Sequence, residues 1–473
     1  MKIKKTTDYL FENDVLQYRS IVKGFTDKNY VEFDKSAHQS DLIRKIDDLL
    51  TGKIVNKSEN QAAFHPKYRA YEQSAKIPKH LIDAEVYAVE FLNLCWNTAK
   101  DKGFDQINII SIGIGGSYEG PKLLLESLNN PIGFSVPGRE KINYKFITGS
   151  DFSEFEEKTK FLNPENTFFI ASSKSFTTPE TLDSLKKAFN WCKNKNHFFA
   201  ITANPEEPRK HGIENIIFFD NEIGGRYSIW SPITQFHLCG NERASFIKGG
   251  HQADVDLFKN KDYLSFIKRL SFTDIFLNNR GKNVRVILSY LWNLRSLPDY
   301  FQQLEMESLG KPANQDSDYH HTGQIIFGGY GPIAQHSYFQ LLHQGTQEIC
   351  ADIISSKDDE KSLSVAQAIT QSELLANGES DIQLKNEFKV NGNIPVNLFL
   401  LNKFDAFNLG YLIATWEHRT FVTATLLDIN PFDQFGVNAG KIYTKKYLAD
   451  SCLLYTSDAA DEGLGVDLGG RRI

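Results

Sequence analysis

Several signatures are missing from this sequence of 473 residues, and each absence excludes a class of protein. No Cys-x-x-Cys pair occurs among the five cysteines, which are Cys95, Cys192, Cys239, Cys350 and Cys452. An odd, scattered set of this kind excludes a disulfide framework and a cysteine-based zinc site. We therefore expect the reducing cytoplasm as the protein's compartment.

Long apolar runs and an excess of positive charge are also missing. No stretch approaches the roughly 18–20 apolar residues of a membrane span. No apolar run follows the basic start MKIKK, so we expect neither a signal peptide nor a membrane partner. The formal net charge of −6 gives no sign of a nucleic-acid binder, which would usually carry a basic patch. A chain of this charge would have to bind an anionic ligand through hydrogen-bond donors that are placed around the ligand at one site.

The chain is long enough for two domains, because a single hydrophobic core stops growing at roughly 250–300 residues. Residues 1–104 are expected to be mostly helical and polar, with AAFHPKYR around His65 as the conspicuous segment. From residue 105, short apolar runs alternate with amphipathic segments, a pattern typical of parallel strands buried on both faces. The runs lie at 107–113, 144–149, 167–173, 197–203 and 216–220, and then at 284–290, 324–330, 348–354 and 396–401.

Two successive series of this kind predict the α/β class, with a doubly wound, mostly parallel sheet in each of two domains. We assign residues 105–240 to the first domain and residues 241–450, including a C-terminal helix, to the second. In such sheets ligands bind beyond the carboxyl ends of the strands. Residues 451–473 contain four glycines and no helical period. We interpret them as non-native sequence, similar to an out-of-frame adapter, or as a disordered tail.

Two loops that directly follow predicted strands suit an anion. In GIGGS, Gly113 to Ser117, glycines let backbone amides approach an anion, and the next helix adds positive potential. No Gly-Lys-Ser/Thr follows, and Tyr118 occupies the third glycine position of a dinucleotide fingerprint, so neither nucleotide motif fits. In SSKSFTTPET, Thr178 suits an N-cap and Pro179 the first helical position, beside several hydroxyls. Each loop alone is equally typical of an ordinary turn or cap.

Two further segments carry charged side chains that suit catalysis. GGRYSIWS places Arg226 in a glycine-flanked loop, where a guanidinium can stabilise an enediolate; a surface salt bridge is the ordinary alternative. QQLEMESLGK is typical of a helix that ends near Gly310. Gln303 and Glu307 are four residues apart and share a face, whereas Glu305 points elsewhere. The helix dipole favours protonation near this end, which suits a base that takes up and returns a proton. Most such glutamates are simply solvated.

Two last segments are less specific. GGYGPIAQHSYFQLLHQGT carries His336 and His343, seven residues apart, and a zinc pair would need a spacing nearer four and a further ligand. We therefore reject a metal site; one histidine is a candidate acid/base group and the other a core histidine, and spacing does not say which. EHRTFV and the residues that follow it lead to Gln434 and Lys441. Spacing alone gives Lys441 no role.

Together these six segments resemble the glucose-6-phosphate isomerase family, in the family's order and over roughly residues 105–441. The resemblance implies two sugar-isomerase (SIS) domains and no metal or cofactor. It also implies the reversible isomerisation of glucose 6-phosphate and fructose 6-phosphate through a cis-enediolate, a step of glycolysis and gluconeogenesis. In the family a histidine reaches across a dimer interface into the neighbouring site, so the resemblance implies an obligate homodimer.

Residue by residue, the resemblance implies that Glu307 is the proton-shuttling base and Arg226 steadies the enediolate. It implies that His336 and Lys441 act together in ring opening. The implied substrate contacts are Gly116, Ser117, Ser173, Lys174, Ser175, Thr178, Thr181, Gln303 and Gln434.

The chain departs from the family at several points, among them the segment after Lys311, which diverges strongly, and the C-terminus. Leu309 stands where the family usually has asparagine, and Ile333-Ala334 stands before Gln335-His336 where many members have Asn-Gly. Two alternatives remain: an isomerase with broader specificity, such as one that also accepts mannose 6-phosphate, and a non-catalytic SIS-type sugar-phosphate sensor. A sensor needs the phosphate loop but not the glutamate, arginine, histidine and lysine together, and all four are present.

Overall fold

The computed structural model describes residues 9–70, 79–128, 142–238, 240–315, 319–358, 361–379 and 386–461. The chain divides into two compact units, Met1–Phe432 and Asp433–Ile473. Across the described ranges, no helix is both long enough and apolar enough to cross a bilayer.

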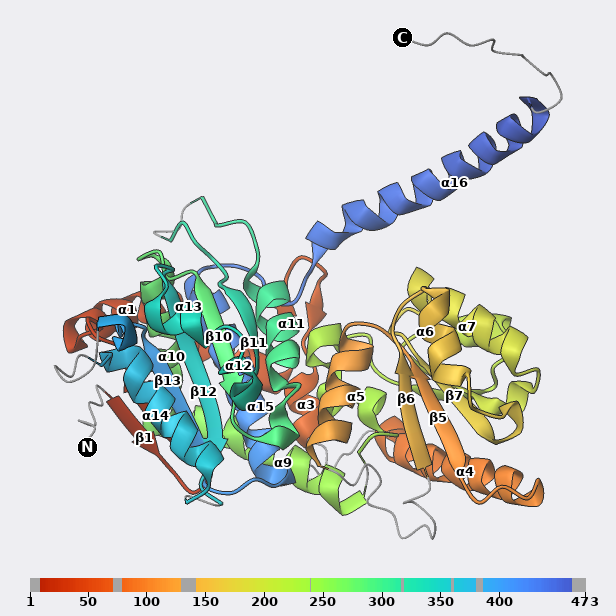
Figure 1. Ribbon diagram of the computed structural model, residues 1–473, viewed down its shortest axis with the longest axis horizontal. Helices are drawn as coiled ribbons and strands as arrows, with labels where there is room; N and C mark the ends of the chain where they lie inside the picture. The colour runs from red at the N-terminus through yellow and green to blue at the C-terminus, as the bar shows by residue number, and fades with distance from the viewer. Residues whose placement is uncertain are drawn as a thin grey trace. The chain divides into compact units, whose positions relative to one another are not determined.

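A parallel sheet of five strands organises the first half of the larger unit (Figure 1). Its strands are β5 (Ile107–Ile112), β6 (Ile142–Ile147), β7 (Thr167–Ser172), β8 (Phe198–Thr202) and β9 (Asn215–Phe218). All five apolar runs of the first predicted series are therefore strands. The spatial order is β6-β5-β7-β8-β9, so the winding direction reverses between β5 and β7. A sheet of this order binds its ligands in the crevice at that switch point.

Helices cover both faces of this sheet, as the prediction of a doubly wound sheet requires. On one face, α4 (Lys79–Asp101) belongs to the same core cluster as Ile109 and Phe168. On the other face, α6 (Phe152–Thr159) and α7 (Pro179–Trp191) share a cluster with Ile110 and Phe169. Neighbouring residues of one strand thus enter opposite cores, which explains why the strand sequences are mostly apolar rather than strictly alternating.

The second sheet has six strands in the order β1-β2-β13-β12-β10-β11. Four of them come from the second predicted series: β10 (Val284–Ser289), β11 (Ile325–Tyr330), β12 (Ile349–Ser356) and β13 (Val396–Leu401). They are parallel and repeat the winding of the first sheet. The other two, β1 (Tyr9–Glu12) and β2 (Leu16–Ile21), come from the region expected to be mostly helical, and β2 pairs antiparallel with β13.

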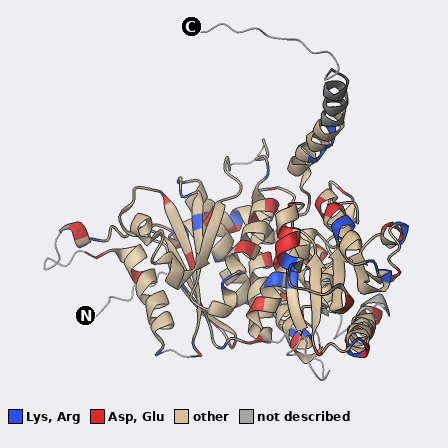
Figure 2. Cartoon of the chain, turned by 45° about the vertical axis from the view of Figure 1, so that its right-hand side comes forward, with Lys and Arg blue, Asp and Glu red and all other residues tan. Residues whose placement is uncertain are grey.

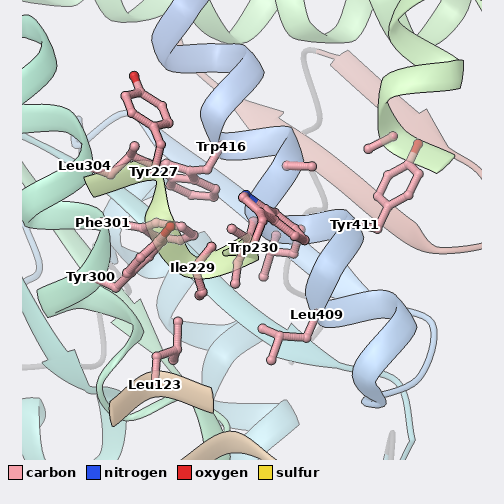
Figure 3. Packing of buried hydrophobic residues seen from close by; sticks show 14 of the residues in the cluster. Leu123, Tyr227, Ile229, Trp230, Tyr300, Phe301, Leu304, Leu409, Tyr411 and Trp416 are labelled. Carbon is pink, nitrogen blue, oxygen red and sulfur yellow. The ribbon is translucent and has the colours of Figure 1, made fainter. Parts of the chain in front are cut away.

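The helices of the second half also form two layers. One face of the sheet packs against α12 (Gly331–Ala334), α13 (Phe339–Gln344) and α14 (Leu363–Asn377). The largest core cluster draws on α9 (Gly240–Lys259), α10 (Lys261–Asn278), α11 (Leu297–Leu309) and α15 (Ala406–Leu426). Figure 3 shows aromatic side chains of this cluster, in which Phe301 of α11 stacks on Trp416 of α15 at 4.1 Å between ring centroids. This packing fixes α11 firmly in the core.

The remaining elements of the larger unit connect or flank these layers. They are α1 (Asp27–Gln39), α2 (Leu42–Thr51), β3 (Ile54–Asn56), β4 (Gln61–Ala62), α3 (His65–Ala70), α5 (Gly116–Ser127), α8 (Glu206–Lys210) and the 3-10 helices η2 (Pro164–Asn166), η3 (Lys195–His197), η4 (Gly225–Trp230), η5 (Pro232–Thr234), η6 (Trp292–Leu294) and η7 (Asn386–Phe388).

The smaller unit contains a 3-10 turn, η8 (Phe435–Val437), and one long helix, α16 (Asn438–Asp461). The helical pattern was expected to stop after Asp450, and that boundary is wrong, because α16 continues to Asp461. Residues 451–461 contain no glycine or proline, and the first glycine of the tail is Gly463, so nothing in this stretch breaks a helix. Within the tail that was predicted to be disordered, residues 451–473, the structure shows residues 451–461 as helix, and residues 462–473 lie outside the described residues.

Candidate active site

The two anion-friendly loops meet at the switch point of the first sheet. GIGGS follows β5, the serine- and threonine-rich loop follows β7, and these two strands are neighbours. A Cβ atom built on Gly113 would lie 3.1 Å from the carbonyl oxygen of Ser172, so the two loops are in direct contact. Gly115 has φ = +59°, a backbone conformation that glycine adopts without strain. The sheet therefore brings both loops to the edge where a ligand is expected.

Hydroxyl groups organise the loop before α7. The Ser173 hydroxyl lies 3.2 Å from the Thr178 hydroxyl and accepts a hydrogen bond from the backbone N–H of Phe176. Phe176 has φ = +55°, so the Ser173 contact holds an uncommon backbone conformation. Thr178 occupies the predicted N-cap position and Pro179 begins α7, yet the Thr178 side chain does not cap the helix. The first amides of α7 therefore remain available to an anion.

Lys174, Ser175 and Thr181 complete this loop. Burial lowers the pKa of the Lys174 ammonium, an effect opposed by the carboxylates of Glu59 and Glu222. A partly desolvated ammonium interacts strongly with an anion. Ser175 is exposed and its hydroxyl contacts that of Thr177 at 2.8 Å. The Thr181 hydroxyl is buried and has no hydrogen-bond partner within the described chain. A buried hydroxyl without a partner is rare, and a bound phosphate would supply one.

Arg226 and Glu307, which are 81 residues apart in sequence, are joined directly. Arg226 lies on η4, is buried, and donates from Nη1 to Oε2 of Glu307 at 3.2 Å. It also donates from Nη2 to the carbonyl oxygen of Pro431. Glu307 lies near the end of α11, which stops at Gly310 as expected. The structure thus places a carboxylate beside a fixed guanidinium.

Gln303 and the glycine loop adjoin this pair. Gln303 donates from Nε2 to Oε1 of Glu307 at 3.3 Å, which confirms that the two side chains share a helix face. The Oε1 atom of Gln303 is buried and has no hydrogen-bond partner among the described residues. A Cβ on Gly116 would lie 1.9 Å from the carbonyl oxygen of Gly225, so only glycine permits this approach of α5 to η4. Ser117, the next residue, is half-buried at the start of α5.

Glu305 faces away from this cluster, as its helical position predicts. It is buried, accepts hydrogen bonds from Arg285 and from the indole N–H of Trp416, and belongs to a buried ionic network. In that network Asp274 receives hydrogen bonds from Arg285 and Arg419. Figure 2 marks the acidic and basic residues along the ribbon, and both kinds lie close together near the centre of the view. The network anchors α11 from its buried side.

Three further predicted site residues lie in other segments of the chain. His336 lies between α12 and α13, is exposed, and its ring makes no hydrogen bond within the described residues. His343 contacts Gln371 at 2.9 Å and packs edge-on against Phe339, which fits the structural histidine of the two. Gln434 and Lys441 belong to the smaller unit, where both are exposed and Lys441 lies on α16.

Sequence reasoning missed a serine at the centre of the cluster. Ser308, adjacent to Glu307 on α11, accepts a hydrogen bond from Nε of Arg226 at 2.8 Å. The Tyr227 hydroxyl lies 3.0 Å from the same Ser308 oxygen. Ser308 is four residues after the core residue Leu304, so its helical position pointed to the buried side of α11. Its contact with Arg226 depends on how η4 packs on α11, which no local pattern encodes.

Metal ligands do not cluster in the described ranges: no group of three or more His, Cys, Asp or Glu side chains there could hold a metal ion. The site offers the carboxylate of Glu307, the guanidinium of Arg226 and the ammonium of Lys174, together with several hydroxyls and backbone amides.

Comparison with known families decides the relationship. The family model for phosphoglucose isomerase matches residues 22–459, which is most of the chain. The chain belongs to the phosphoglucose isomerase family. The segments that the sequence analysis compared with this family, from GIGGS to Lys441, all lie within the match.

Individual relatives support the same assignment. A glucose-6-phosphate isomerase of Legionella pneumophila (strain Lens) is 33% identical over 424 residues, covering 86% of this chain and 83% of that protein. Glucose-6-phosphate isomerase 2 of Neisseria gonorrhoeae is 32% identical over 475 residues, covering 90% of this chain and 86% of that protein. Among solved structures, a glucose-6-phosphate isomerase from Chlamydia trachomatis has a TM-score of 0.81 at 21% identity, covering 94% of this chain and 90% of that one. That likeness supports the fold.

Proposed function

We propose that this chain interconverts glucose 6-phosphate and fructose 6-phosphate, with Glu307 as the base. The observation that carries the assignment is the contact of 3.2 Å between Arg226 and Glu307 beside the two loops of the switch point. Family membership and the names of the relatives support the substrate. The loop with Ser173, Lys174, Ser175, Thr178 and Thr181 holds the phosphate, and Gly116, Ser117, Gln303 and Gln434 contact the sugar.

The reaction needs a proton transfer and a means of stabilising charge. Glu307 removes the proton from the second carbon of the open-chain aldose, which gives a cis-enediolate, and returns it to the first carbon to give the ketose. Arg226 stabilises the negative oxygen of that intermediate, because its guanidinium is already oriented and buried. The phosphate anchor orients the reacting end, so remote binding energy contributes to the rate.

Ring opening and assembly form a second part of the proposal. His336 and Lys441 act as the acid/base pair that opens the sugar ring, and the exposed ring of His336 enters the site of a second copy of the chain. A homodimer with shared sites follows from this arrangement. We place the dimer in the cytoplasm, a reducing compartment that suits the free, buried thiols of Cys95, Cys192 and Cys350.

A coupled assay tests the activity. Purified protein is supplied with fructose 6-phosphate, and the glucose 6-phosphate formed is oxidised by an added dehydrogenase with a spectroscopic readout. Steady production of glucose 6-phosphate is expected. Binding of the sugar phosphate without turnover would contradict the proposal and favour the sensor.

A further inference from the structure

Two nitrogen atoms of the Arg226 guanidinium, Nε and Nη1, contact side chains of the same helix, α11. The Nη1 atom contacts Glu307 at 3.2 Å, and the Nε atom donates to the hydroxyl of Ser308 at 2.8 Å. Both partners are consecutive residues of α11. A guanidinium is planar, so bonds through Nε and Nη1 fix its plane as well as its distance. The helix that carries the base therefore also orients the cation.

Ser308 itself has a partner that restricts its hydroxyl. The Tyr227 hydroxyl lies 3.0 Å from the Ser308 oxygen, and both side chains are buried. Burial raises the pKa of Tyr227 to about 12, so this hydroxyl stays neutral and keeps its proton at physiological pH. A neutral hydroxyl can exchange a hydrogen bond with Ser308 while the Ser308 oxygen still accepts from Arg226.

His65 packs against the ring of Tyr227. Its ring stacks on the Tyr227 ring at 4.6 Å between centroids, with 22° between the ring planes. Burial and the neighbouring Arg69 lower the pKa of His65 well below its ordinary value, so the ring is neutral and packs as an aromatic group. Phe432 also contacts Tyr227, at 5.4 Å between centroids. The segment around His65, to which the sequence assigned no role, thus packs against the tyrosine that contacts Ser308.

We propose that Ser308 is a positioning residue of the isomerase reaction, whose hydroxyl, ordered by Tyr227, fixes the guanidinium plane of Arg226 beside Glu307. The inference rests on the proposed function, because it assigns the support of Arg226 in that reaction. A free arginine side chain has many rotamers, and a donor stabilises a transition state best when it is already oriented. Without the hydroxyl, the buried Nε–H of Arg226 loses this partner, and the guanidinium is oriented less firmly, although Nη1 still contacts Glu307 and Nη2 still contacts Pro431.

The variant Ser308→Ala tests this role. We expect kcat to fall at least about 10-fold and KM for fructose 6-phosphate to change less than about 2-fold, because the oriented charge matters mainly in the transition state. Binding of a hydroxamate analogue of the enediolate should weaken in proportion to kcat, whereas binding of a six-carbon sugar-alcohol phosphate should stay unchanged. Equal weakening of both ligands, or an unchanged kcat, would overturn the proposal.

A matched control and a double variant separate positioning from stability. Ser372→Ala removes a buried hydroxyl from α14, where Ser372 donates to the carbonyl oxygen of Ile369, and its kcat should match wild type. Arg226→Lys removes the Nε–H group, so adding Ser308→Ala to it should cost little further activity. Additive losses would overturn the proposal. If Ser308→Ala does not fold, Tyr227→Phe carries the same test, since it keeps the ring against His65 and removes the hydroxyl from Ser308.

The same measurements distinguish this inference from the proposed function. A wild-type protein that does not isomerise fructose 6-phosphate contradicts the proposed function. An active wild type with an unaffected Arg226→Lys variant contradicts the role of Arg226. An active wild type, an impaired Arg226→Lys and a normal Ser308→Ala contradict the positioning role alone.

Discussion

Glu305 and Glu307 are two residues apart on α11 and have opposite environments. The Glu305 side chain is 3% exposed and pairs with Arg285, whereas that of Glu307 is 35% exposed and contacts Arg226. Two residues along a helix correspond to a turn of about 200°, so the two carboxylates leave the helix on opposite sides. The C-terminal end of α11 is therefore anchored in the core through Glu305, while Glu307 faces the candidate site.

Replacement of Glu307 by glutamine should abolish the base while it preserves the shape of the side chain. We expect kcat to fall at least about 10²-fold with little change in KM. The carboxylate acts as a base in the proton-transfer step and is not needed to bind the substrate. Steady-state kinetics of Glu307→Gln with fructose 6-phosphate checks this. A near-normal kcat would assign the base to another residue.

Thr181→Val should separate binding from stability. The Thr181 hydroxyl has no partner within the described chain, and valine has nearly the same shape, so the melting temperature should stay close to that of wild type. KM should rise more than kcat falls, because a phosphate contact serves the ground state and the transition state alike. Calorimetric binding of glucose 6-phosphate checks the change. Equal affinity in both proteins would remove Thr181 from the phosphate site.

Mixing two inactive variants should restore activity if His336 serves a neighbouring subunit. Glu307→Gln and His336→Ala are unfolded together and refolded at equal amounts. Each mixed dimer then contains one site with both groups intact, so about a quarter of the wild-type activity should return. The separately refolded variants are the controls. No recovery, with mixed dimers demonstrated by mass spectrometry, would place His336 in its own subunit's site.

Glu305→Ala should destabilise the fold. The change leaves Arg285 in the core without one of its partners, and breaking a buried ion pair in this way costs about 3–5 kcal/mol. The free energy of unfolding in urea measures the loss. The matched control is Glu348→Ala, which breaks the more exposed pair with Lys282 and should cost less than about 1 kcal/mol. Similar losses in both variants would mean that the network does not anchor α11.

Acid should weaken a second buried network, around Asp254. Burial raises the pKa of this carboxyl, but Arg69 and His418 outweigh it, and the pKa falls from 3.8 to about 2. Since the folded pKa is the lower one, the stabilisation is present above about pH 4 and is lost as the pH falls toward 2.

The free energy of unfolding of wild type and Asp254→Asn, measured in urea at successive pH values, checks this expectation. The advantage of wild type should be constant above pH 4 and should shrink by about 2 kcal/mol toward pH 2. A difference that does not change with pH would show that folding does not lower the pKa of Asp254.

Local sequence patterns predicted most strands because each strand of the two parallel series is a short, mostly apolar run. The run 107–113 corresponds to β5 and the run 396–401 to β13, within one residue. By contrast, β2 was missed, because Leu16–Ile21 contains Gln17 and Arg19 and is recognisable as a strand only beside β13. Its pairing is a property of the fold rather than of the segment.

The candidate site shows the same division. Gln303 and Glu307 could be assigned to one helix face from their spacing, and the hydrogen bond between them confirms it. The contacts of Arg226 with Ser308 and Pro431 join segments far apart in the chain. Such contacts depend on the packing of η4 against α11 and could not be predicted. The catalytic and binding roles given to all the site residues, His336, Lys441 and Gln434 included, stay predictions, and so do the domain boundaries at residues 104 and 240.

The pairing of β2 with β13 joins Leu16 to Leu401, and it has a consequence for synthesis on the ribosome. All strands of the first sheet have been synthesised once Phe218 is added, so that sheet can form as these residues leave the ribosome, while translation of the second half continues. Strand β2 is among the first segments to emerge, yet its partner follows only after a delay on the order of 20 to 80 s at usual elongation rates. During that interval one edge of an unfinished sheet is exposed, and a nascent chain of this topology is a natural client for chaperones.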